Sequence, residues 1–164
     1  VIAGSCSVAT QGQVALMKKD HETYELDPMA IACGRDVAQE ALDWASTRLS
    51  EKPILIYSTA TPEQVKAVQD RLGREHAGSM VEETFGKIAK GLVAKGARRL
   101  LVAGGETAGA VVGALGIEGL AIGPENDPGA PWTFSIGEPP LALALKSGNF
   151  GTPDFFTKAF KVQQ

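Results

Sequence analysis

The sequence has few cysteines, no long apolar run and little excess charge. Only 2 of its 164 residues are cysteine, which excludes a disulfide-stapled secreted scaffold and favours a cytoplasmic location. No apolar stretch approaches the ~18 residues of a membrane helix, so we expect no membrane partner. The net charge of −3 provides no polycationic surface, so we expect no nucleic-acid partner.

Two common nucleotide-binding motifs are absent as well. The chain contains no G-x-x-x-x-G-K-[ST] loop, and it contains no G-x-G-x-x-G fingerprint, which disfavours a cofactor-binding dehydrogenase domain. An initiator methionine is also missing. The chain opens with Val1-Ile2-Ala3-Gly4, which is typical of the end of a buried strand. We therefore expect residues 1–164 to form a single domain that is a fragment of a longer protein.

The composition is that of a globular domain, with 44% apolar and 21% charged residues. The hydrophobic pattern predicts strands at 1–3, 21–26, 53–57 and 99–103, which alternate with helices at 8–19, 27–50, 61–72, 81–96 and 106–115. Strands follow at 120–122, 132–136 and 141–145, with a loop at 123–131 and a closing helix at 153–160. This order predicts an α/β fold, a layered helix–sheet–helix domain with a mixed, mostly parallel sheet.

The most informative motif joins the apolar strand at 99–103 to the following helix through Gly104-Gly105-Glu106-Thr107. A strand that runs through glycine into a helix presents free N–H groups to an anion, and Thr107 can add a hydroxyl. Gly105 can supply both open space for a ligand and a positive φ angle. An ordinary tight turn capped by Thr107 fits the same spacing equally well.

Three further stretches are candidates for binding. Gly4-Ser5-Cys6-Ser7 also lies between a strand and a helix, where a serine can contact a nucleotide or cap the helix. Lys146-Ser147-Gly148 can wrap a phosphate or a base, or form a plain turn beside a solvated lysine. Glu125 and Asp127 have the chemistry of Mg²⁺ ligands, but turn capping is the more frequent role in such a loop.

Taken together, these motifs resemble the four-carbon acid sugar kinases, and within them the 3-oxo-tetronate and D-threonate kinases. The resemblance covers essentially the whole chain, but it matches only the C-terminal, nucleotide-binding domain of that family. It is carried by Gly4-Ser5-Cys6-Ser7, Val102 to Thr107, Ile122-Gly123-Pro124-Glu125, Asp127 to Trp132, and Leu145 to Gly151.

The resemblance implies an ATP- and Mg²⁺-dependent kinase that phosphorylates the 4-hydroxyl of a four-carbon sugar acid, 3-oxo-tetronate in the first instance. The residues through which the family binds ATP fall here on Ser5 (with Ser7 as the rival), Gly105, Glu106, Thr107, Ala108 and Gly148. Ala108 stands where the family often has serine, so it can still bind ATP through its backbone but not through a hydroxyl.

The sugar acid would bind mainly to the missing N-terminal domain. We therefore assign no catalytic residue and no metal ligand, and we expect the fragment alone to be inactive. A homo-oligomer is a further expected assembly. The alternative function is a non-catalytic regulatory domain that binds a phosphate metabolite in the same loops.

Overall fold

Within the residues that the structure describes (1–50, 52–59, 66–70 and 73–161), seven strands form one mixed sheet in the order β2-β3-β1-β4-β7-β6-β5. The structure is a computed structural model. The strands β2, β3, β1, β4 and β7 pair in parallel, and β6 pairs antiparallel with both β7 and β5. The expected mixed, mostly parallel sheet is therefore confirmed. The strand bounds are β1 Ile2–Ala3, β2 Thr23–Glu25, β3 Leu55–Tyr57, β4 Arg99–Ala103, β5 Leu120–Asp127, β6 Ala130–Ser135 and β7 Ala142–Lys146.

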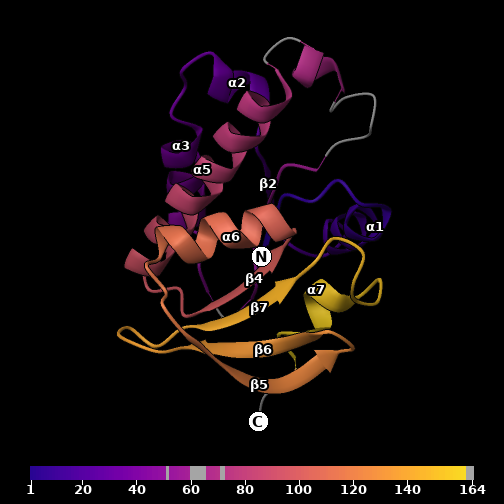
Figure 1. The fold of residues 1–164 in the computed structure, drawn as a ribbon, viewed down its shortest axis with the longest axis vertical. Helices are drawn as coiled ribbons and strands as arrows, with labels where there is room; N and C mark the ends of the chain where they lie inside the picture. Colours follow the sequence, from indigo (N-terminus) through magenta and orange to yellow (C-terminus); the bar gives the residue numbers. More distant parts are fainter. Residues whose placement is uncertain (51, 60–65, 71–72, 162–164) are drawn as a thin grey trace.

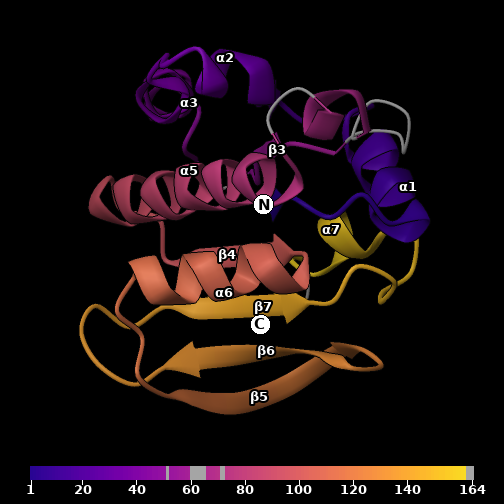
Figure 2. The ribbon, with the colours of Figure 1, turned by 45° about the horizontal axis from the view of Figure 1, so that its top comes forward.

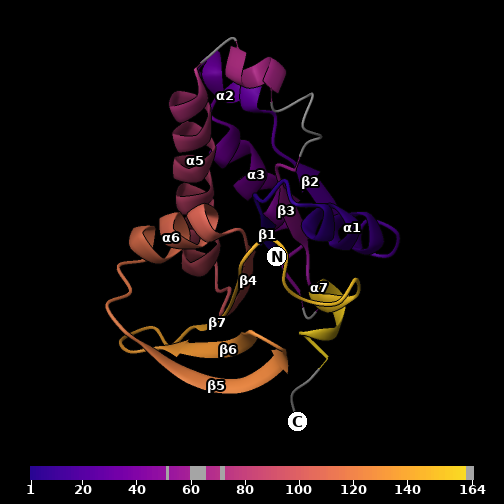
Figure 3. The same cartoon turned by 45° about the vertical axis from the view of Figure 1, so that its right-hand side comes forward.

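Helices cover both faces of the sheet. In Figure 3, α5 and α6 lie on one side of the strands and α1 and α7 lie on the other. Figure 2 shows α5 between the α2–α3 pair and α6, and it contacts all three. The helix bounds are α1 Val8–Met17, α2 Pro28–Ala32, α3 Val37–Ser46, α5 Arg74–Ala94, α6 Gly105–Ala114 and α7 Phe155–Lys158, and residues 66–70 are also helical.

Two hydrophobic cores follow from the alternation of side chains along the strands. In β4, Leu100 and Val102 pack toward α5 and α6, whereas Leu101 and Ala103 pack toward α1 and α7. Every one of these four side chains is buried. Burial on both faces explains why the strand is apolar from Leu100 to Ala103, as expected for a parallel strand between two helical layers.

Side-chain caps fix the start of several helices. Ser7 caps α1 by accepting a hydrogen bond from Thr10 N, and Asp27 and Asp36 cap α2 and α3 in the same way. The sequence signals at Asp27-Pro28 and Asp36 therefore mark two separate helices. The helix start predicted at Thr61-Pro62-Glu63 lies outside the described residues.

The prediction of a loop at 123–131 is wrong. The chain instead continues as β5 to Asp127, turns at Pro128-Gly129, and returns as β6 from Ala130. Figure 1 shows this hairpin at the outer edge of the sheet, at the bottom of the view. Pro124 is tolerated because β5 is an edge strand whose register shifts between Ile122 and Glu125 and again before Asp127.

In the part of the chain that the structure describes, no helix is both long and apolar enough to cross a membrane.

Candidate nucleotide-binding cleft

A cleft of about 780 Å³ opens at the edge where the parallel strands end. Ligands of α/β sheets bind at this edge, because the loops that follow the strands converge there. The loops after β1 and β4 form one part of the wall, the segment after β2 forms another, and α5 closes the side. The lining comprises Gly4, Ser5, Cys6, Glu25, Leu26, Asp27, Pro28, Ser58, Thr59, Ala67, Val68, Gln69, Ala77, Gly78, Val81, Glu82, Gly104, Gly105, Glu106 and Thr107.

The loops after β1 and β4 are in direct backbone contact. The N–H groups of Gly4 and Ser5 both donate to the Ala103 carbonyl, at 3.0 and 3.2 Å. A Cβ atom at Gly4 would overlap Thr107 Oγ1 and would lie 3.0 Å from the ring of Phe85. Gly4 is therefore required by the closeness of the two loops, and the cleft floor between them consists largely of backbone.

Gly104 is the N-cap residue of α6 and has a φ angle of 127°. The residue of this turn with a positive φ is therefore Gly104. The expectation that Gly105 supplies it is wrong, because Gly105 is already the first residue of the helix. The other half of that expectation is confirmed: a Cβ atom at Gly105 would meet nothing within 4 Å. Gly105 therefore borders open space in the cleft.

The start of α6 points its free N–H groups at the cleft. The first hydrogen bond of this helix runs from Ala108 N to Gly104 O at 2.8 Å. The N–H groups of Gly105, Glu106 and Thr107 precede that bond, and they carry the positive end of the helix dipole. Gly105 and Glu106 are exposed, whereas Thr107 is 4% exposed and packs against Gly4. Such an end attracts an anion.

The turn after β7 lies behind the first loop. A Cβ atom at Gly148 would lie 2.5 Å from Ser5 Oγ and 3.0 Å from Ser7 Oγ, so the turn packs directly on both serines. The Gly148 carbonyl accepts hydrogen bonds from Ser7 Oγ at 2.5 Å and from Thr10 Oγ1 at 2.9 Å. The three predicted loops therefore converge, although Gly148 does not itself line the cleft.

The two rival serines have different roles. Ser5 lines the cleft, and its Oγ accepts a hydrogen bond from Ser7 N at 3.2 Å. The hydroxyl of Ser7 caps α1 and donates to Gly148 O, away from the cleft lining. Ala108 also lies outside the lining, one step into α6, where it packs against the core. Four of the six predicted binding residues thus border the cleft: Ser5, Gly105, Glu106 and Thr107.

Carboxylates border both ends of the cleft. Burial, and then the charge and hydrogen bond of Glu106, raise the pKa of Glu82 above its ordinary value. At the other end, Tyr57 Oη donates to Glu25 Oε2 at 2.8 Å and accepts from Lys18 Nζ at 2.7 Å. Neither Glu82 nor Glu25 belongs to a recognisable motif, so the sequence alone gave no reason to single them out.

Lys146 departs furthest from what its position in the sequence predicts. A lysine at the end of a strand is expected in solvent, yet Lys146 is 1% exposed. Its Nζ atom donates to Thr10 Oγ1 at 3.0 Å, to Gly148 O at 2.9 Å and to Ser147 O at 3.2 Å. Burial lowers the pKa of Lys146 to about 8.

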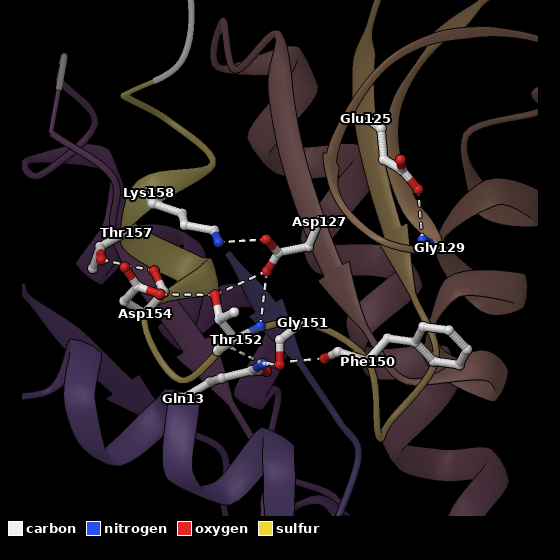
Figure 4. A network of polar contacts seen from close by, with 10 residues as sticks. All are labelled: Gln13, Glu125, Asp127, Gly129, Phe150, Gly151, Thr152, Asp154, Thr157 and Lys158. Carbon is white, nitrogen blue, oxygen red and sulfur yellow. Dashed lines mark hydrogen bonds and ion pairs between the residues drawn. The ribbon is translucent and has the colours of Figure 1, made fainter.

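Glu125 and Asp127 stabilise turns, the role that the sequence favoured over Mg²⁺ binding. Figure 4 shows Glu125 Oε1 accepting from Gly129 N at 2.8 Å, within the hairpin turn. Asp127 Oδ2 accepts from the N–H and the hydroxyl of Thr152, at 2.8 and 2.9 Å, and Oδ1 pairs with Lys158. This network joins the hairpin to the loop before α7.

Comparison with known proteins decides the family. The family model described as "Nucleotide-binding C-terminal domain" matches residues 1–156. The chain belongs to this family. This nucleotide-binding domain is 55% identical, over 98% of its length, to a 3-oxo-tetronate kinase of Pseudomonas savastanoi. It is 54% identical, over 99% of its length, to a 3-oxo-tetronate kinase of Burkholderia multivorans. A crystal structure of a protein from Haemophilus influenzae has the same fold, with a TM-score of 0.93, 36% identity and 98% coverage of this chain.

The nucleotide-binding domain spans little more than a third of these relatives. It covers 37% of the Pseudomonas kinase, 38% of the Burkholderia kinase and 39% of the Haemophilus chain. The family assignment therefore applies to this domain, and the three convergent loops are features of the domain itself.

The Asp127 network generates a prediction for stability. Burial alone would raise the pKa of Asp127, but Lys158 and Thr152 outweigh it and hold the pKa below its ordinary value. The stabilisation is therefore present above about pH 4 and is lost as the pH falls through the folded-state pKa. We expect Asp127→Asn to lower the free energy of unfolding by ~1–3 kcal/mol at pH 7, measured by urea denaturation.

The difference between wild type and Asp127→Asn should shrink as the pH falls below about 4 and through the lowered folded-state pKa of Asp127, where the wild-type carboxylate also becomes neutral. Asp20→Asn removes an exposed carboxylate and serves as the matched control, with a change within about 0.5 kcal/mol. Equal stability of Asp127→Asn and wild type at pH 7 would show that the network contributes nothing.

Proposed function

We propose that this chain is the ATP-binding domain of a kinase that phosphorylates the 4-hydroxyl of a four-carbon sugar acid, 3-oxo-tetronate. The observation that carries the proposal is the convergence of two glycine loops and the start of α6 on one cleft. The relatives named 3-oxo-tetronate kinase supply the reaction and the acceptor. They favour the kinase over a non-catalytic regulatory domain.

The phosphates of ATP would lie against the loops after β1 and β4. The N–H groups of Gly105, Glu106 and Thr107 would donate to the phosphate oxygens, and Ser5 would add a hydroxyl. Ala108 would contribute its backbone at most, and Gly148 would act by holding Ser5. The apolar part of the lining, with Leu26, Val68 and Val81, suits the base.

The residues present fit a Mg²⁺ ion beside those phosphates. Mg²⁺ is usually held by one or two carboxylates together with phosphate oxygens of the substrate. Glu82 and Glu106 share a hydrogen bond at the cleft and would supply such carboxylates. When bound, the ion would offset the negative charge of the phosphoryl oxygens.

In this proposal, binding of the sugar acid and removal of its hydroxyl proton are carried out by a part of the enzyme outside this chain. The chain is the C-terminal domain of a two-domain kinase, and a larger N-terminal domain binds the sugar acid and supplies the base. This division agrees with the 37% of the Pseudomonas kinase that the chain covers. The whole enzyme would act in carbohydrate metabolism in the cytoplasm.

Self-association is also part of the proposal. The outer hairpin and the residue that follows it expose three large apolar side chains, Ile122, Phe134 and Ile136, which are 82%, 40% and 70% exposed. Exposed apolar side chains gathered in one part of the surface are typical of a protein interface. A homo-oligomer would cover them.

Gly105→Val tests the position of the phosphates. The backbone at Gly105 is helical and its Cβ position is open, so the variant should fold with a stability change within about 1 kcal/mol. The branched side chain would fill space beside the α6 N–H groups. We expect the dissociation constant for ATP to rise at least ~10-fold, measured by calorimetry, with the melting temperature recorded without ligand.

Gly113→Val is the matched control, because Gly113 lies in the same helix and its Cβ position is also open. It should bind ATP like the wild type. A folded Gly105→Val variant with wild-type affinity would remove this loop from the nucleotide site.

The domain division generates a separate prediction. The 164-residue chain alone should bind ATP but should not phosphorylate 3-oxo-tetronate or threonate, because the acceptor site is elsewhere. A coupled assay for ADP formation in the presence of each sugar acid measures this directly. Robust phosphorylation by the isolated chain would contradict the division of roles.

A further inference from the structure

Lys146 is a buried cation that the fold does not neutralise. Its Nζ atom bonds to two carbonyl oxygens and one hydroxyl, the Thr10 side chain. A buried ammonium group in a stable fold is normally paired with a carboxylate, because desolvation of an isolated charge is costly. Among the described residues, no carboxylate forms an ion pair with Lys146.

The elements around Lys146 bring no opposite charge to it. The adjoining turn, 147–151, contains no ionisable side chain. The helix α7 faces the ammonium group with the ring of Phe156, at 6.0 Å, while Lys158 of that helix pairs with Asp127. Lys18, which follows α1, bonds to Tyr57 at the other end of that helix.

The position of Lys146 is unfavourable for a second reason. Thr10 belongs to the first turn of α1, which Ser7 caps. The start of a helix carries a partial positive charge and disfavours a cation nearby. Folding alone would therefore be better served by an apolar side chain at this position. An anion bound near these loops would remove the disadvantage.

Lys146 is connected to the cleft through two successive contacts, first with Gly148 and then from Gly148 to Ser5. Its ammonium group holds the carbonyl of Gly148, and Gly148 packs on Ser5 so closely that a Cβ atom would lie 2.5 Å from Ser5 Oγ. Ser5 lines the cleft. The ammonium group thus fixes the turn that supports Ser5, from the side opposite the ligand.

We propose that Lys146 is a positioning residue of the nucleotide site, which holds the 147–148 turn against Ser5 and provides the buried positive charge that a bound polyphosphate balances. The proposal rests on the proposed function, since it requires an anionic nucleotide in the cleft. It gives Lys146 no direct contact with the ligand and no covalent step.

The proposal predicts that nucleotide binding is coupled to protonation of Lys146. In the free chain, burial lowers the pKa of this lysine to about 8, so a large part of it is neutral at pH 9. A bound polyphosphate favours the charged form and raises that pKa again. ATP binding should therefore take up nearly one proton at about pH 9 and almost none at about pH 7.

Calorimetry of ATP binding to the 164-residue chain, in buffers of different ionisation enthalpy, measures this uptake. We expect the dissociation constant of the wild type to rise up to ~5-fold between about pH 8 and pH 9, as the protonated fraction of Lys146 falls. Lys146→Met should bind more weakly at pH 7 and should take up no proton at pH 9. Lys146→Arg keeps the charge and should bind without proton uptake at either pH.

Lys161→Met removes an exposed lysine and is the matched control, with proton uptake like the wild type. If Lys146→Met does not fold, the wild type and Lys146→Arg still decide the question. ATP binding with equal affinity and no proton uptake at pH 7 and 9 would overturn the role of Lys146 while leaving the nucleotide site intact. Failure of the wild type to bind ATP at either pH would overturn the proposed function, and the role of Lys146 with it.

Discussion

The close approach of the loops after β1 and β4 is the constraint on which the rest of the site depends. Gly4 and Ser5 both donate to the Ala103 carbonyl, and Gly4 leaves no room for a side chain against Thr107. This contact aligns the start of α6 with the end of β1. It also makes the floor of the cleft a surface of backbone groups, which can approach a phosphate more closely than side chains can.

A cleft whose floor consists of backbone groups does not need basic side chains to bind an anion. The described lining of the cleft contains the acidic residues Glu25, Asp27, Glu82 and Glu106, and it contains no lysine or arginine. In the proposed function, binding of a polyphosphate there would depend on helix N–H groups, on a metal ion held by the carboxylates, and on a cation behind the loops. Lys146 is placed to be that cation. Its three acceptors also tie the third loop to α1.

Much of the fold could be predicted from the sequence, because local signals and tertiary packing agree in most elements. The strand predicted at 99–103 matches β4 residue for residue, and Asp27 and Asp36 cap the helices that they were expected to start. The hairpin at 120–135 could not be predicted. Its prolines are typical of a loop, and they are accommodated by register shifts that exist only in the paired sheet.

The site was predictable as a set of loops, but the role of each residue was not. Spacing located the glycine pair at 104–105, yet the geometry of the turn decides that Gly104 takes the positive φ and Gly105 the open space. The choice between Ser5 and Ser7 depends on which hydroxyl caps α1. The burial of Lys146 results from the packing of α1 and the Gly148 turn around it, segments that are far apart in the sequence.

The central claim is that ATP binds where these three loops meet. Chemical-shift mapping of the backbone amides of the chain, titrated with ATP and Mg²⁺, tests it most directly. We expect the amides of Ser5, Thr107 and Gly148 to shift together, with the same dissociation constant. Shifts confined to α5 and residues 66–70, with these three amides unchanged, would contradict it.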